Sequence, residues 1–119
     1  MSCPHTSARN GLEAAVVHPI AALTTPAPAA VVSRTLVDRP AGTVTAFAFA
    51  AGQGLSEHSA PYDALVQVTA GSITITIGGT PQEVPAGAMI LMPANIPHAL
   101  RTEADATMLL TMIRSGPTA

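Results

Sequence analysis

The chain has 119 residues and a formal net charge of −2, and only 10 % of its residues are charged while 48 % are hydrophobic. A disordered chain has low hydrophobicity and high net charge, so this composition excludes a largely disordered protein. The length suits one domain with a single core. Because so few charges are available to cover a monomer, we expect part of the apolar surface to meet a second copy in a homodimer.

The same composition argues against nucleic acid and membrane partners. The five basic residues are all arginine and are scattered along the chain, whereas binding to phosphates or to anionic lipid requires clustered cations. No apolar run approaches the roughly 18 residues of a transmembrane helix, and the first ten residues lack the apolar stretch of a secretory signal. The single cysteine, Cys3, excludes a disulfide framework and a cysteine-based zinc site. We therefore expect a cytoplasmic protein.

Residues 1–30 differ from the remainder of the chain. They contain prolines and runs of alanine with weak periodicity, so they predict an irregular N-terminal arm with one short turn or strand near residues 13–17. From residue 31 to residue 119 the pattern is that of a single β domain. The expected strands are 31–37, 43–50, 64–68, 72–77, 82–84, 88–92, 98–102 and 106–114.

Residues 72–77 give the clearest strand signal, because Ile alternates with Ser and Thr at a period of two. Gly78-Gly79 follows at once and predicts a hairpin turn. About eight short strands separated by Gly, Pro and Asn, with no helix of ten residues, favour an all-β sandwich or barrel such as a small jelly roll.

Two of the four histidines lie at the boundaries between the expected turns and strands. His58 and His98 each lie where a turn meets a strand, and antiparallel strands could place both imidazoles side by side inside a barrel. Two inward imidazoles are the beginning of a metal site. His5 and His18 lie in the arm and have no such relation.

Residues 52–71, GQGLSEHSAPYDALVQVTAG, resemble the first motif of the cupin superfamily, which is Gly, five residues, His-x-His, three or four residues, Glu, six residues and Gly. The positions in register are Gly52, His58, Pro61, Val68 and Gly71.

Residues 87–98, GAMILMPANIPH, resemble the second motif of that superfamily, with Gly87, Pro93 and His98 in register. Asn95 replaces the usual Gly. Because Asn tolerates a positive φ almost as Gly does, the turn can survive this change.

The resemblance spans about residues 40–114 and implies a double-stranded β-helix, or jelly-roll barrel, that is usually dimeric and holds its site inside. Metal-binding members use four ligands from the two motifs. In this sequence the second His position is Ala60 and the Glu position is Ala64, so His58 and His98 alone remain.

Three interpretations of this pair stay open. His58 and His98 could hold one divalent ion (zinc, iron, nickel or manganese), completed by water, a small acid, Glu57 or Asp63. Alternation turns Glu57 away from the face that His58 uses, and Asp63 would need a bulge to point inward. The other two interpretations are an apolar pocket with hydrogen-bonding or acid–base histidines, and two histidines satisfied by backbone carbonyls in a barrel that binds nothing.

We expect the protein to bind a small organic ligand in a pocket lined by His58, Ala60, Ala64, Val66 and His98. The alternative is a metal-dependent dioxygenase or isomerase that acts on a small organic acid. A further alternative is a metal-free epimerase or cyclase with His58 or His98 as its base.

Other residues have both a catalytic and a structural interpretation. Tyr62 is a catalytic candidate because sugar epimerases of the superfamily use a tyrosine; otherwise it packs as a lid or dimer contact while Asp63 caps the turn. The methionines could line the pocket or supply soft ligands to a metal; otherwise they fill the core and the interface. They are Met89, Met92, Met108 and Met112.

Overall fold

The computed structural model describes residues 11–114, so the expectations for Cys3 and His5 lie outside the described residues. Nearly all regular structure in this range is β, and its one helical element is a single 3₁₀ turn, η1 (Ile20–Ala22). No helix within residues 11–114 is long and apolar enough to cross a membrane. The strands are β1 (Val31–Arg39), β2 (Gly42–Phe49), β3 (Gly54–His58), β4 (Asp63–Ala70), β5 (Ser72–Ile77), β6 (Thr80–Pro85), β7 (Met89–Met92), β8 (His98–Arg101) and β9 (Ala106–Ile113).

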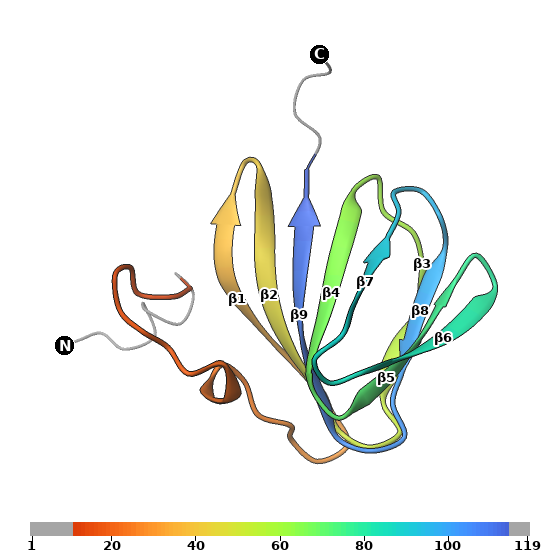
Figure 1. Ribbon diagram of the computed structural model, residues 1–119, viewed down its shortest axis with the longest axis horizontal. Helices are drawn as coiled ribbons and strands as arrows, with labels where there is room; N and C mark the ends of the chain where they lie inside the picture. Colours follow the sequence, from red (N-terminus) through yellow and green to blue (C-terminus); the bar gives the residue numbers. More distant parts are fainter. Residues whose placement is uncertain (1–10, 115–119) are drawn as a thin grey trace.

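These strands form two antiparallel sheets (Figure 1). One has the order β1-β2-β9-β4-β7 and the other the order β3-β8-β5-β6. Strands that are neighbours in a sheet are mostly far apart in the sequence, as expected for a jelly roll. The all-β fold predicted from short strands and frequent turns is confirmed.

Strand β3 is the main departure from the expected elements. Its only large apolar residue is Leu55, and Ser56, Glu57 and His58 are exposed, so the sequence offers no alternation from which to predict a strand. The strand forms because it lies at the edge of its sheet and pairs with β8 along one side. His58 is therefore the last residue of a strand, while His98 is the first residue of β8.

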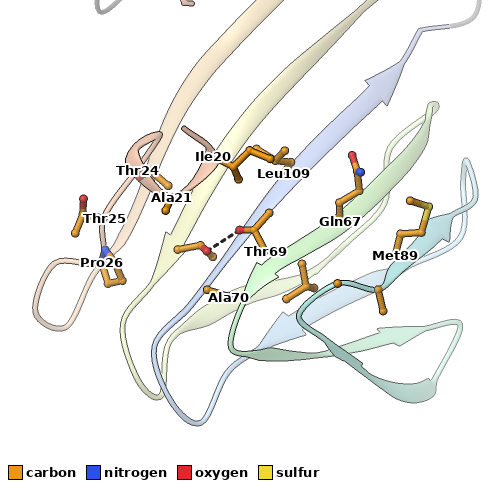
Figure 2. A pocket seen from close by; sticks show the side chains of 14 residues that line it. Ile20, Ala21, Thr24, Thr25, Pro26, Gln67, Thr69, Ala70, Met89 and Leu109 are labelled. Atoms are coloured by element: carbon orange, nitrogen blue, oxygen red, sulfur yellow. Dashed lines mark hydrogen bonds between the residues drawn. The ribbon is translucent and has the colours of Figure 1, made fainter. Parts of the chain in front are cut away.

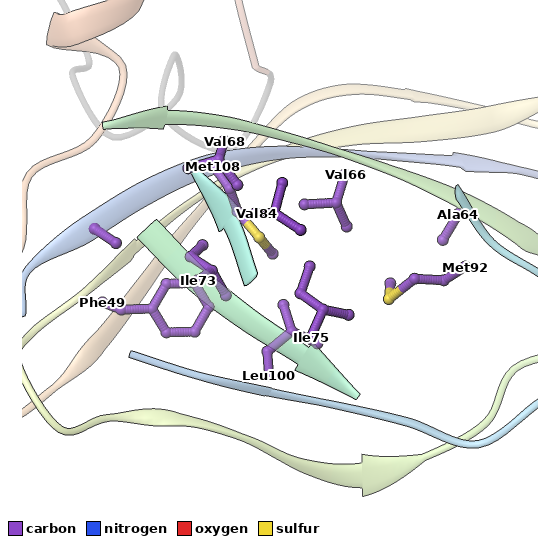
Figure 3. Close-up of a cluster of buried hydrophobic side chains, with 11 residues drawn as sticks. Phe49, Ala64, Val66, Val68, Ile73, Ile75, Val84, Met92, Leu100 and Met108 are labelled. Atoms are coloured by element: carbon purple, nitrogen blue, oxygen red, sulfur yellow. The ribbon is translucent and has the colours of Figure 1, made fainter. Parts of the chain in front are cut away.

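The core lies between the two sheets, where inward-facing side chains of both sheets meet (Figure 3). The alternation in β5 is realised as predicted, since Ile73 and Ile75 are fully buried. From the opposite sheet, Phe49, Val66 and Met108 are buried just as completely. This packing fixes the separation of the sheets and with it the space at the open end of the barrel.

Residues 11–30 contain no strand, and Ala15 adopts a positive φ of 63° within the turn near residues 13–17. Leu23 of this segment packs against Leu36 and Ala46 on the outer side of β1 and β2. The Arg34 guanidinium donates a hydrogen bond to the Leu23 carbonyl over 3.2 Å. Residues 11–30 therefore lie against the outer side of the larger sheet and outside the interior of the barrel.

Gly54→Ala tests the pairing of β3 with β8. A Cβ at position 54 would collide with the backbone carbonyl of Leu100. Replacing Gly by Ala in an unstrained position stabilises by about 0.4–1 kcal/mol, so a net loss isolates the collision. We expect urea unfolding to show a loss of more than about 1 kcal/mol, whereas Ser56→Ala on the same exposed strand stays within about 0.5 kcal/mol. A Gly54→Ala variant as stable as the parent would contradict this strand pairing.

Candidate functional site

A β-bulge places His58 beside His98. Gly54 pairs with Arg101 and Leu55 with Leu100, but the register then shifts so that His58 pairs with His98. With a regular register, Glu57 would oppose His98. The extra residue in β3 therefore decides which side chain faces the second histidine, which is a common role of bulges beside functional sites.

The two imidazoles meet through their Nε2 atoms, which are 3.2 Å apart. The rings are nearly perpendicular, with an interplanar angle of 73° and centroids 4.4 Å apart. The Nδ1 atom of His58 lies 2.7 Å from the Ser56 carbonyl oxygen, and that of His98 lies 3.2 Å from the Ile96 carbonyl oxygen. Because a carbonyl oxygen can only accept, both Nδ1 atoms donate and both rings are held by their own backbone.

The two histidines differ in their exposure. His98 is buried, with only 5 % of its surface exposed, whereas His58 lies at the exposed end of β3. Burial lowers the pKa of His98 below its ordinary value, and the charge of a protonated His58 lowers it further, while the hydrogen bond to the Ile96 carbonyl opposes both effects. A second positive charge is therefore disfavoured at this pair.

A cavity of about 100 Å³ opens beside the two rings. Ala60 and Ala64 line it together with both histidines. Val66, the fifth expected lining residue, instead packs in the core and is fully buried. It points inward as its alternation requires, but it lies deeper than the end of β4 that reaches the cavity.

The remaining lining is apolar and comes from neighbouring strands. Ala64 pairs with Met92 of β7 on one side and with Met112 of β9 on the other, so both thioethers flank the alanine. Met89 is exposed on the outer side of β7. Three lining residues were not singled out from the sequence, namely Leu55, Leu100 and Leu110. Alternation in β8 and β9 could have identified Leu100 and Leu110, whereas β3 offers no alternation from which to identify Leu55.

Two hydrogen bonds join the turn before His98 to the segment after His58. The Asp63 carboxylate accepts from the Ala94 amide over 2.9 Å, and the Asn95 amide donates to the Ala60 carbonyl over 2.7 Å. Asn95 adopts a φ of 66°, so it does replace glycine in a left-handed turn position. Asp63 thus holds this turn and does not point inward.

The other candidate groups lie outside the cavity lining. Glu57 is exposed, and Tyr62 is half-buried in the segment between β3 and β4. His18 stays in the arm, where its Nε2 lies 3.1 Å from the Glu13 carbonyl oxygen. The structure therefore brings together His58, His98, Ala60 and Ala64, and leaves the catalytic candidate Tyr62 apart from them.

The donors around the pair do not fit a zinc, iron, nickel or manganese centre. Such ions take three or four protein ligands of the imidazole, thiolate or carboxylate type. Within residues 11–114, no third His, Cys, Asp or Glu joins the two imidazoles. Methyl groups of Ala60 and Ala64 stand where further donors would be needed, and Glu57 and Asp63 are directed elsewhere.

A larger hollow of about 580 Å³ lies on the outer face of the five-stranded sheet, between the arm and strands β4, β7 and β9 (Figure 2). Its floor contains Thr69, whose hydroxyl lies 2.7 Å from that of Thr107. The lining contains no titratable side chain. The smaller cavity beside the histidines is therefore the stronger candidate for a specific site, because it combines an enclosed apolar wall with convergent polar groups.

Comparison with known proteins agrees with this architecture. The family model described as Cupin domain matches residues 46–114. The crystal structure of the conserved SPY1581 protein of unknown function from Streptococcus pyogenes is 35 % identical, with a TM-score of 0.85, and the match covers 91 % of this chain and 95 % of that chain.

Two further solved structures are similar. A Cupin 2 conserved barrel domain protein from Leptotrichia buccalis is 36 % identical over 74 % of this chain and 43 % of that chain, with a TM-score of 0.72. A cupin superfamily protein from Desulfitobacterium hafniense DCB-2 is 23 % identical over 89 % of this chain and 96 % of that chain, with a TM-score of 0.81. A search of the curated proteins found no match.

Asp63→Ala tests how the turn before His98 is held. Removing the carboxylate leaves the Ala94 amide without its partner, and a hydrogen bond of this kind contributes about 1–2 kcal/mol. We expect thermal unfolding to show a loss of this size, with most of the stability kept in Asp63→Asn, whose side-chain oxygen can still accept. Equal losses in the two variants would show that charge, and not the hydrogen bond to Ala94, matters at this position.

Proposed function

The chain belongs to the cupin family, and we propose that this member binds a small, mostly apolar organic molecule in the barrel, held between His58 and His98. One observation supports the proposal above all others. The two Nε2 atoms, 3.2 Å apart, belong to the only titratable side chains in the described lining of the cavity, and Ala, Leu and Met supply the rest of its wall. A few convergent polar groups in an apolar enclosure are typical of small-molecule sites.

The volume limits the size of the ligand. The cavity of about 100 Å³ is smaller than the roughly 150 Å³ apolar cavity known to admit benzene. Because benzene has six non-hydrogen atoms, a ligand with at most about six such atoms is expected. The larger amino acids, nucleotides and sugars exceed this space unless part of the molecule extends past the exposed His58.

The alternative of a metal-dependent dioxygenase or isomerase is less well supported. It requires donors that residues 11–114 do not bring to the pair. The epimerase or cyclase alternative loses one candidate because Tyr62 does not line the cavity. We therefore place this protein among the ligand-binding cupins, and a cytoplasmic location remains a prediction from the sequence.

We also propose that the expected homodimer forms through the outer face of β7, β4 and β9. Met89, Leu91 and Ile113 are exposed there, at 58 %, 50 % and 53 % of their surface. The strand register places uncharged residues between them, namely Leu65, Gln67, Leu109 and Thr111. A second copy of this chain suits such a face, because it would cover apolar side chains and meet a single charged residue, Asp63, which lies opposite Ile113 at one end of β4.

Ala60→Leu tests the ligand site by filling it. The longer side chain should occupy the cavity, so we expect affinity for small organic acids, amides or alcohols of about six non-hydrogen atoms to fall at least tenfold in ligand-observed NMR. Ala104→Leu, at an exposed position away from the cavity, is the matched control and should bind as the parent does. Equal binding to the parent and to Ala60→Leu would place the ligand elsewhere, for example in the outer hollow.

Leu91→Glu tests the dimer. A charge on this face should oppose association, so we expect sedimentation equilibrium to give the dimer mass for the parent and the monomer mass for the variant. Gln82→Glu adds the same charge at an exposed position of the other sheet and should stay dimeric. A monomeric parent at about 100 µM would contradict the proposed interface, because stable dimers dissociate well below this concentration.

A further inference from the structure

We propose that the outer hollow shown in Figure 2 is a second ligand site, which takes a neutral, mostly apolar molecule that carries a carbonyl group. The proposal goes beyond the ligand assigned to the barrel, because the hollow and the cavity beside the histidines share no lining residue. It is supported by the construction of the hollow, its volume, its lack of charge and the hydroxyl groups in its floor.

Two parts of the chain that are distant in the sequence form the hollow. Arm residues from the range 20–26 stand on one side, and the outer face of β4, β7 and β9 forms the floor (Figure 2). The arm wall is anchored to β1, because Leu23 packs against Leu36 and its carbonyl accepts a hydrogen bond from the Arg34 guanidinium. Tertiary contacts therefore fix the shape of the hollow.

The volume of the hollow suits an organic molecule of moderate size. At about 580 Å³ it lies within the roughly 300–1,000 Å³ that is usual for small-molecule sites. It is almost four times the roughly 150 Å³ that admit benzene, so it has room for about 20 non-hydrogen atoms. Ile20 of the arm and Met89 of β7 border it, with 57 % and 58 % of their surface exposed. An apolar ligand would remove both side chains from water.

The lining favours an uncharged ligand. It contains no titratable side chain, and its polar side chains are the hydroxyls of four threonines and the amide of Gln67. Arg34 does not line the hollow and is engaged with the Leu23 carbonyl. An ion in the hollow would therefore lose part of its hydration without gaining a counter-charge.

Thr69 of β4 and Thr107 of β9 indicate which polar group the ligand carries. Their hydroxyl oxygens are 2.7 Å apart, so one hydroxyl donates to the other. Within residues 11–114 neither hydroxyl has another hydrogen-bond partner, which leaves the second proton for an acceptor in the hollow. Because the pair is half-buried, a ligand that displaces water there must accept this proton. A carbonyl oxygen does so without adding charge.

Prodan, a naphthalene with a propanoyl and a dimethylamino group, is a suitable probe. It is a neutral ketone of about 17 non-hydrogen atoms, which fits the hollow but exceeds the barrel cavity. In a fluorescence titration we expect one bound Prodan per chain. Since a second copy that contacts Met89 could compete for the hollow, the titration is made at both about 1 µM and about 100 µM protein, and the same stoichiometry is expected at both.

Two analogues of Prodan test the assigned chemistry. The carboxylate 6-(dimethylamino)-2-naphthoate has almost the same shape but carries a negative charge, so we expect it to bind at least tenfold more weakly than Prodan. The analogue with a propyl group in place of the propanoyl group has no acceptor for the Thr69–Thr107 pair. We expect it to bind about fivefold more weakly, which is the usual contribution of one hydrogen bond.

Variants of the hollow locate the probe. Thr69→Val together with Thr107→Val keeps the shape of both side chains and removes both hydroxyls, so it should abolish the preference for Prodan over the propyl analogue. Ala21→Leu enlarges the arm wall and should weaken both neutral probes at least tenfold. Ala22→Leu is the matched control, because it lies on the same 3₁₀ turn, is exposed and does not line the hollow.

The outcomes separate this site from the barrel cavity and from the dimer. Unchanged Prodan binding in Ala21→Leu, or naphthoate binding as tight as that of Prodan, overturns the proposal. Loss of Prodan at the higher protein concentration also overturns it, because a second copy then occupies the hollow. Each of these results leaves the ligand proposed for the barrel standing, since that ligand is too small to need the hollow.

Discussion

The Nε2–Nε2 contact between His58 and His98 is the interaction on which the rest of the candidate site depends. It exists because a one-residue bulge in β3 turns His58, and not Glu57, toward the second histidine. Each ring is held at Nδ1 by a carbonyl two residues earlier in the chain, so neither can easily rotate away from the other. Every chemical property that we assign to the cavity follows from two imidazoles fixed in this orientation without a third donor.

The apolar surroundings of the pair offer the two imidazoles few other polar partners. In water, an imidazole with an unused lone pair would find a solvent partner at little cost. Here Ala60 and Ala64 leave open space, and the methionines on both neighbouring strands supply no hydrogen-bond donor. A charge placed at such a wall is poorly solvated and interacts strongly with whatever enters. The same barrel could serve different chemistry with few substitutions, since a fold does not determine the function of its site.

Much of this architecture could be predicted from the sequence, because the relevant signals are local. The alternation of Ile73 and Ile75 identifies a strand and its buried face, and Gly78-Gly79 identifies the turn that follows. That Asn95 can replace glycine in the turn could also be predicted, because this depends on one local property, namely whether the residue tolerates a positive φ. The cupin motifs added the pairing of distant segments, which periodicity alone does not provide.

The parts that could not be predicted depend on long-range register. Strand β3 has no alternation of its own and exists only through its pairing with β8. Whether Asp63 points inward or holds the turn at Ala94 depends on how two segments 31 residues apart meet, which no local pattern encodes. Val66 lies on the same face of β4 as Ala64, but it is two residues further along the strand and is buried in the core.

If His58 and His98 bind an organic ligand without the help of a metal, the purified protein should hold no stoichiometric metal ion, and elemental analysis measures this. The protein should be untagged and carry Cys3→Ser, so that neither a polyhistidine tag nor the thiol contributes. After soaking with zinc, iron, nickel and manganese and removal of excess ion, our account predicts less than about a tenth of an equivalent per chain, because two imidazoles alone hold such ions weakly. A content near one metal ion per chain, lost in His98→Gln and kept in His18→Gln, would contradict the account and make metal chemistry the basis of the function.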